Sequence, residues 1–174
     1  MACTLTTGRK VPCKSAVGGL KTVYFADFGT LGTTTITSGE LTAIAGTPDL
    51  FQFDIKGNSS LESAINSSRE NGTTFYETTL NLTLTYLEKA TQEELKLIAH
   101  ARPHVFVEDY NGNYFVVGLE HGAEVTGGTI VSGAAMGDLS GFTLTMVAQE
   151  TAPPYFVTST VVTGNASATQ ITPN

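Results

Sequence analysis

The sequence predicts a mainly β protein, a β-sandwich or barrel-like pair of antiparallel sheets with one flanking helix at about residues 91–102. Most of the chain consists of short stretches in which apolar and polar residues alternate, separated by Gly, Asn and Pro, as expected for strands and turns. Only one stretch has helical periodicity. The 174 residues suffice for one core. We therefore expect a single domain, with an N-terminal arm at 1–20, a β core at 21–154 and a C-terminal arm at 155–174.

The predicted helix has recognisable ends. Thr91 and Glu94 have the spacing of a capping box, and Pro103 disfavours helical geometry at the residue before it. A helix of about three turns is too short to be stable alone, so its apolar face must cover one flank of a sheet. That face consists of Leu95, Ile98 and Ala99.

A β-hairpin follows the helix at once. Its Asn111-Gly112 pair is favoured in two-residue type I′ turns, and such a turn would set Val107 opposite Val116. The expected unit is a helix lying against or beside a sheet.

The other strands are predicted from alternation. Phe51 and Phe53 alternate with polar residues, so we expect both rings to point inward. Predicted extended segments are 23–28, a stretch near 36, 50–55, 119–131, 142–150 and 155–162. The residues that follow this last segment are too polar to bury much surface, so the C-terminal tail is read as an arm or a loose end.

A long hairpin precedes the helix. With Asn71-Gly72 as its turn, Leu61 pairs with Leu82 and one side is polar or acidic. That side carries Glu62, Asn66, Glu77, Thr79, Asn81 and Thr83. A strand face of this kind usually lies in solvent; the alternative is a surface that lines a water-filled passage.

The charge of the chain is unevenly distributed. The net charge is −7, but the first 26 residues carry +4 and no acid, which leaves 16 acidic and five basic residues, or −11, for the remainder. The four basic residues are Arg9, Lys10, Lys14 and Lys21. They indicate either an arm that meets an acidic surface of a neighbouring copy or a solvated terminus. A nucleic-acid-gripping domain is disfavoured, because no basic patch continues into the core.

The sequence contains no motif that supports an enzyme, a cofactor or a metal site. Glu108 and Asp109 are adjacent on a strand and point to opposite faces, so they cannot form one acid/base pair; we expect them to solubilise a hairpin. His100 and His104 have ligand-like spacing, but Pro103 ends the helix between them. We read them as surface or helix-end residues.

The chain also predicts its compartment. Met1 to Leu20 is polar, basic and rich in Gly, and no apolar run reaches the roughly 20 residues of a membrane span, so we expect folding in a cytoplasm and no membrane insertion. Cys3 and Cys13 are expected to be reduced thiols, with a disulfide as the alternative.

Four consecutive segments of the chain form a characteristic order. They are the helix ATQEELKLIAHARP, the hairpin VFVEDYNGNYFVVG, the loop AAMGDLSG and the strand FTLTMVAQE followed by Pro-Pro. In this order they resemble the major tail tube proteins of tailed bacteriophages. The resemblance covers roughly Cys13 to Pro154. It implies a β-sandwich flanked by one helix, assembled as hexameric rings that stack into a tube in the virion tail, made in the host bacterial cytoplasm.

The resemblance also implies roles for particular residues. Inner strands of six subunits would surround the channel through which DNA passes without specific binding, and the basic arm would contact adjacent rings. The candidate channel-lining residues are Glu62, Asn66, Glu77, Asn81 and Thr83, although another strand pair could line the channel. Partners would be other copies and further tail proteins such as a sheath, terminator or baseplate. Alternatives are a tail connector or terminator, or a receptor- or carbohydrate-binding β module that uses Tyr110 and Tyr114.

Overall fold

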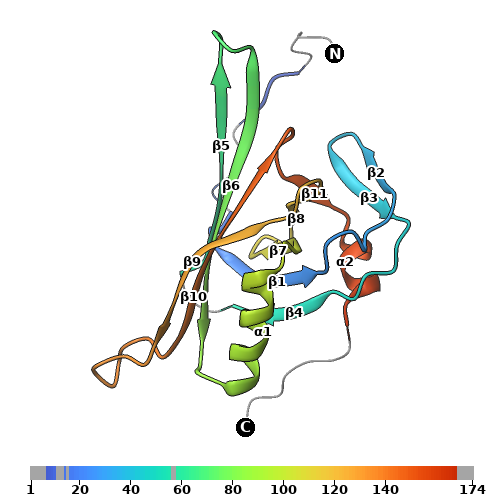
Figure 1. Cartoon of the computed structure of the whole chain (residues 1–174). Coiled ribbons are helices and arrows are strands. Elements are labelled where there is room, and N and C mark those ends of the chain that lie inside the picture. Colours follow the sequence, from blue (N-terminus) through green and yellow to red (C-terminus); the bar gives the residue numbers. More distant parts are fainter. Residues whose placement is uncertain (1–6, 11–13, 15, 56–57, 168–174) are drawn as a thin grey trace.

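The computed structural model describes residues 7–10, 14, 16–55 and 58–167. Within them the chain is mainly β, with two sheets and two helices, which confirms the predicted fold class (Figure 1). The larger sheet has seven strands in the order β2-β3-β11-β8-β7-β1-β4, and the smaller has four in the order β5-β6-β10-β9. All pairs in the four-stranded sheet are antiparallel, whereas β11 pairs with β3 in parallel.

The strands of the seven-stranded sheet are β1 Leu20–Ala26, β2 Thr34–Thr37, β3 Glu40–Ile44, β4 Phe51–Asp54, β7 His104–Asp109, β8 Tyr114–Val117 and β11 Tyr155–Val157. Those of the four-stranded sheet are β5 Ser60–Ser68, β6 Thr73–Thr85, β9 Glu124–Val131 and β10 Gly141–Glu150. The helices are α1 Lys89–His100 and α2 Ser159–Asn165.

The main core lies between the two sheets. Apolar side chains of β6 and β10, such as Leu82 and Met146, meet side chains of β1 and β7, such as Val23 and Val107. A second core covers the opposite face of the seven-stranded sheet, where Phe106 of β7 is fully buried. Because β7 is buried on both faces, it contains three consecutive apolar residues, Val105, Phe106 and Val107, instead of an alternating pattern.

Helix α1 begins earlier than the sequence predicts. It starts at Lys89, and the N-cap residue Glu88 makes no side-chain capping hydrogen bond, so the predicted capping box is wrong. Leu95 is buried and Ile98 packs partly on the main core, as predicted, but Ala99 is exposed. The helix touches the sandwich along a narrow stripe only, which is why the third residue of the predicted face lies in solvent.

The β5–β6 hairpin is shifted from its predicted register. Leu61 pairs with Leu80, not with Leu82, and the whole register is displaced by two residues. Because side chains alternate with a period of two, this displacement leaves every residue on its predicted face.

The turn of this hairpin explains the shift. Ser68 pairs with Thr73, which leaves four residues in the loop. The Ser68 hydroxyl accepts a hydrogen bond from the backbone N–H of Asn71 at 3.3 Å, and Gly72 has a φ of 63°, which glycine adopts without strain. The local hydrogen bond favours this longer loop over the two-residue turn.

The β7–β8 hairpin is shifted by one residue. Val107 lies opposite Phe115 and not opposite Val116, so the predicted pairing is wrong. The backbone N–H of Asp109 donates to the carbonyl oxygen of Asn113 at 3.0 Å, which leaves three residues in the loop. The Asp109 carboxylate also accepts the N–H of Asn113 at 2.8 Å, and an aspartate at this position favours a type I turn over type I′.

The C-terminal segment belongs to the fold as far as residue 167. The predicted strand at 155–162 is only three residues long, β11, and helix α2 follows it. Val161 and Val162 are buried in the second core, and the backbone N–H of Ser167 donates to the carbonyl oxygen of Leu50 at 2.8 Å. The interpretation of this described part as an arm or loose end is therefore wrong. The segment is polar on average, but it contains two adjacent valines that pack in the core.

Strand β4 also differs from expectation. Phe53 packs against the main core, but Phe51 is 39% exposed because β4 is an edge strand. The residues that flank β4, Leu50 and Ile55, carry more of the burial.

Candidate functional site

The side of the four-stranded sheet that faces away from the core is the strongest candidate for function, and we call it the polar face. It brings together all the channel-lining candidates, Glu62, Asn66, Glu77, Asn81 and Thr83, which are exposed or half-buried. The opposite side of the same strands contains Leu80, Leu82 and Leu84, all in the main core. Strict alternation along β6 therefore separates the two sides.

The polar face continues onto β10 and β9, which the sequence reasoning did not include. Thr143, Thr145 and Gln149 lie beside residues of β6, and Glu124 and Thr129 lie beside β10. The signal was present in the sequence, because these β10 residues alternate with the apolar residues that form the inner side. Sequence alone could not say that β10 pairs with β6.

Neighbouring strands are tied together by side-chain hydrogen bonds across the polar face. The Thr145 hydroxyl donates to Asn81 Oδ1 at 3.0 Å, and Gln149 Nε2 donates to Glu77 Oε2 at 2.7 Å. The hydroxyls of Thr129 and Thr143 are 2.6 Å apart. These contacts hold the polar side chains of β6, β9 and β10 against one another.

The charge of this sheet has one sign. Strands β5, β6, β9 and β10 contain no Lys or Arg, and the polar face contains the carboxylates of Glu62, Glu77 and Glu124. Glu150 points the other way; burial raises the pKa of its carboxyl group, which accepts the backbone N–H of Glu120 at 2.7 Å. The polar face is therefore acidic without internal neutralisation.

Two edges of the four-stranded sheet are unpaired within the described chain. They are β5 and β9, each bonded to one neighbouring strand. Figure 1 shows that the β5–β6 hairpin extends well beyond the other strands. In this part Ile65 is 67% exposed and Phe75, which lies among the polar residues of the polar face, is 38% exposed. Phe75 therefore interrupts the side that the sequence predicts to be polar or acidic. A projecting hairpin of two strands with exposed apolar side chains is marginally stable alone, so a partner surface would stabilise it.

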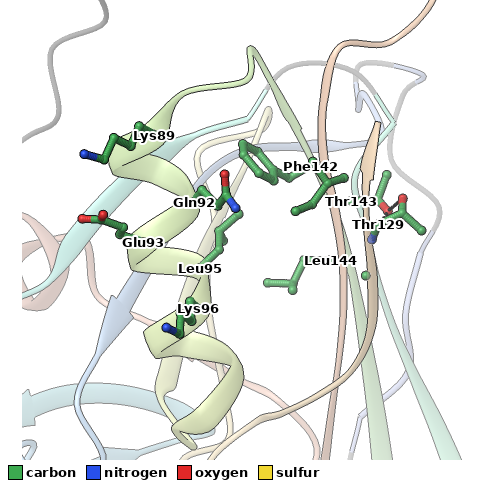
Figure 2. Close-up of a pocket in the computed structure, with 11 residues that line it drawn as sticks. Lys89, Gln92, Glu93, Leu95, Lys96, Thr129, Phe142, Thr143 and Leu144 are labelled. Atoms are coloured by element: carbon green, nitrogen blue, oxygen red, sulfur yellow. Dashed lines mark hydrogen bonds between the residues drawn. The ribbon is translucent and has the colours of Figure 1, made fainter. Parts of the chain in front are cut away.

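A groove runs beside the β9 edge. Figure 2 shows it between α1 and the two strands β9 and β10, with Leu95, Phe142 and Leu144 as apolar walls and Lys89 and Lys96 at the helix side. Its volume is about 560 Å³. A chain that paired with β9 would lie against this groove.

The four basic residues that the sequence predicts for the N-terminal arm separate into two groups. Arg9, Lys10 and Lys14 are exposed, as expected for an arm. Lys21 instead lies in β1, and its Nζ donates to Glu108 Oε1 at 2.8 Å. The structure therefore removes Lys21 from the arm. The reading of Glu108 as a solubilising residue is also wrong, since its side chain is almost buried and paired.

His104 is buried, not a surface or helix-end residue as the sequence suggested. Its Nδ1 lies 2.6 Å from the carbonyl oxygen of Gly118 and its Nε2 accepts the N–H of Gly29 at 3.0 Å, so the neutral Nδ1-H form fits both contacts. Phe28 stacks on the imidazole, and the Arg102 guanidinium lies over the Phe28 ring, 4.9 Å from its centroid. His104 thus joins two loops to the start of β7, while His100 is exposed.

We expect the stability of the protein to fall in mild acid because of His104. Burial lowers the pKa of the imidazole, and the Gly118 carbonyl opposes this shift. The neutral ring is favoured in the folded state, so its contribution is complete above the unfolded pKa near 6.5 and is lost as pH falls through the lower folded pKa. The slope cannot exceed about 1.4 kcal/mol per pH unit for one proton.

The measurement is the free energy of unfolding between pH 7.5 and 5. His104→Gln can keep one donor and one acceptor without titrating, so it should flatten the slope, whereas His100→Gln should keep the wild-type slope. Equal slopes for wild type and His104→Gln would show that His104 does not control acid stability.

Other site types have little support in the described residues. No group of three or more His, Cys, Asp or Glu side chains there is arranged to hold a metal ion, and no helix there is long and apolar enough to span a membrane. Cys3 and Cys13 lie outside the described residues. Of the two tyrosines considered for carbohydrate binding, Tyr110 is exposed, but Tyr114 is half-buried and hydrogen-bonded to Glu108.

Comparison of the chain with models of protein families and with curated proteins finds no match.

Proposed function

We propose that this chain is a structural subunit that assembles with copies of itself into rings, which stack into a phage tail tube whose lumen conducts DNA. The polar face would line the lumen. The observation that carries the proposal is a sheet face with three carboxylates and no basic residue, placed between two unpaired strand edges. The resemblance of the sequence to tail tube proteins points the same way.

The strand directions favour joining the two edges of neighbouring copies. Four strands that alternate in direction place β5 and β9 antiparallel to each other. Copies related by rotation about an axis roughly along the strands keep these directions, so β9 of one copy meets β5 of the next as an antiparallel pair. Every junction of the ring could then continue the sheet without a change of pattern.

The strands of the four-stranded sheet are also staggered, as the strands of a barrel are. The centre of β5, Ala64, lies opposite Glu77 of β6. The centre of β9, Gly128, lies opposite Leu144 of β10, which in turn lies opposite Leu82 of β6. The edges are thus displaced by five residues along β6. That is roughly 17 Å along the strand against roughly 14 Å across the three spacings that separate β5 from β9, a tilt of about 50°, which is steeper than the roughly 35–45° usual in barrels.

The number of copies follows from the resemblance. Six copies would contribute twenty-four strands, and at a tilt of about 50° the barrel backbone would be roughly 57 Å across, wide enough to pass a DNA duplex. An acidic wall without Lys or Arg repels the phosphate backbone and offers no basic side chain that would hold DNA. DNA would pass without specific binding, and further tail proteins would close the two ends of the tube.

Electron microscopy of the purified protein tests the proposal. We expect rings or tubes in negative stain, and chemical crosslinking of rings that have not stacked should give a ladder ending at six subunits. A protein that stays strictly monomeric at high concentration, at both low and high salt, would contradict it.

A further inference from the structure

The turn of the β7–β8 hairpin holds a distant part of the chain. The backbone N–H of Val17 donates to Asn111 Oδ1 at 2.9 Å, and Asn111 Nδ2 donates to the carbonyl oxygen of Val17 at 2.8 Å. One side chain therefore satisfies both backbone groups of a residue 94 positions away in the sequence, as a neighbouring strand would.

Asn111 is itself fixed by the turn. Its backbone N–H donates to Asp109 Oδ1 at 2.8 Å, and its Nδ2 also lies 3.2 Å from Asp109 Oδ2. Asn113 bonds to the same carboxylate through its backbone N–H and its Nδ2, at 2.8 and 2.9 Å, but no hydrogen bond joins it to residue 17. The carboxylate thus orients two asparagines, and one of them contacts the N-terminal segment.

A second contact lies beside the first. Gly19 has a φ of 103°, and a Cβ added there would meet the ring of Tyr110 at 3.3 Å. The chain therefore crosses the Tyr110 ring at a position that only glycine occupies without strain. Two consecutive residues of the turn, Tyr110 and Asn111, determine the path of the segment before β1.

This path places the basic arm at the β5 side of the sandwich. Val17 and Gly18 line a cavity of about 450 Å³ together with Ser60 and Leu61 at the start of β5. The exposed residues Arg9, Lys10 and Lys14 precede this point, and Figure 1 shows residues 7–10 toward the same end of the molecule as the β5–β6 turn.

We infer that Asp109, Asn111 and Tyr110 form a clasp that positions the basic N-terminal arm for contact with a second copy of the chain. The chain beyond residue 26 carries −11, so a basic arm and a second copy of the chain attract each other. The clasp is inferred from the contacts described above. The contact of the arm with a second copy rests, in addition, on the proposed function. Asn111 is a positioning residue, because it contacts the arm and not the neighbouring copy.

The clasp is tested on dispersed subunits by trypsin cleavage after Lys14. Asn111→Ala removes both hydrogen bonds to Val17, so we expect cleavage about tenfold faster than in wild type. Asn113→Ala is the matched control: it removes a bond to the same carboxylate and should leave the cleavage rate unchanged. Thermal unfolding confirms that both variants are folded. Equal cleavage rates for wild type and Asn111→Ala would overturn the clasp.

The use of the arm is tested on assembled protein by the length of tubes in electron micrographs. Asn111→Ala and a variant that lacks residues 1–14 should both form rings but several-fold shorter tubes, while Asn113→Ala should resemble wild type. Faster cleavage together with normal tubes would overturn contact with a second copy. If wild-type protein forms no rings, the proposed function fails, and the cleavage rates still decide whether the clasp exists.

Discussion

Ile65→Asp is expected to abolish ring formation while the subunit remains folded. Ile65 is 67% exposed in the subunit and lies in the projecting part of the edge strand β5, so an aspartate there costs the isolated fold little. In a ring the same side chain would be buried against the next copy, where an unpaired carboxylate costs about 3 kcal/mol or more at each junction. Sedimentation should show monomers only, at concentrations where wild type sediments as rings.

The matched control is Ile36→Asp. Ile36 is also an isoleucine, 41% exposed, but it lies in β2 of the seven-stranded sheet, away from the proposed junction. This variant should assemble as wild type does. Rings of normal yield from Ile65→Asp would exclude the β5 edge from the junction, and loss of assembly in both variants would point to a general effect of exposed charge.

Tubes of the double variant Glu62→Lys, Glu77→Lys are expected to bind DNA that wild-type tubes do not retain. Both carboxylates lie on the polar face and neither is in the core, so folding and assembly should be largely intact. In a hexamer the change places twelve lysines in each ring of the lumen, and the affinity for DNA should fall steeply with added salt. Short linear duplexes should be retained in low salt and released in high salt, and infection should be impaired where DNA passage can be measured.

Comparing linear with circular DNA distinguishes binding in the lumen from binding on the outer surface of the tube. A closed circular plasmid cannot thread into a tube, so the lumen variant should retain linear DNA only. The control Glu93→Lys, Glu94→Lys changes two exposed carboxylates on α1 and should bind linear and circular DNA alike. Retention of both forms by the Glu62→Lys, Glu77→Lys tubes would show that the polar face lies outside.

The polar face shows which features of a strand can be predicted from the local alternation of polar and apolar residues. Alternation along β6 sets Glu77 and Asn81 apart from Leu80 and Leu82 whichever residues they pair with. The predicted register was wrong by two residues. The assignment of residues to the two faces stayed correct only because side chains alternate with a period of two. An error of one residue, as at Val107 in the β7–β8 hairpin, reverses such an assignment unless the strand is buried on both sides.

Other residues needed their tertiary neighbours. The sequence predicts that Glu108 is a surface carboxylate. In the structure, the pairing of β1 with β7 places Lys21 beside it. The sequence predicts that His104 is a surface or helix-end residue. In the structure, the loops that contain Gly29 and Gly118 bond to its two ring nitrogens. Val161 and Val162 lie in a polar tail and are buried because the far face of the seven-stranded sheet is open to them. None of these contacts has a signal in the local sequence.

By itself, the sequence determined the fold class, the presence of helix α1 at the flank and the two-sided character of the long hairpin, because strand and helix periodicities are local properties of the chain; it did not predict α2. Only the tertiary structure decided which strands share a sheet, where each turn ends and which charges are paired. Those outcomes depend on contacts between residues far apart in the sequence, such as the bonds from Asn111 to Val17.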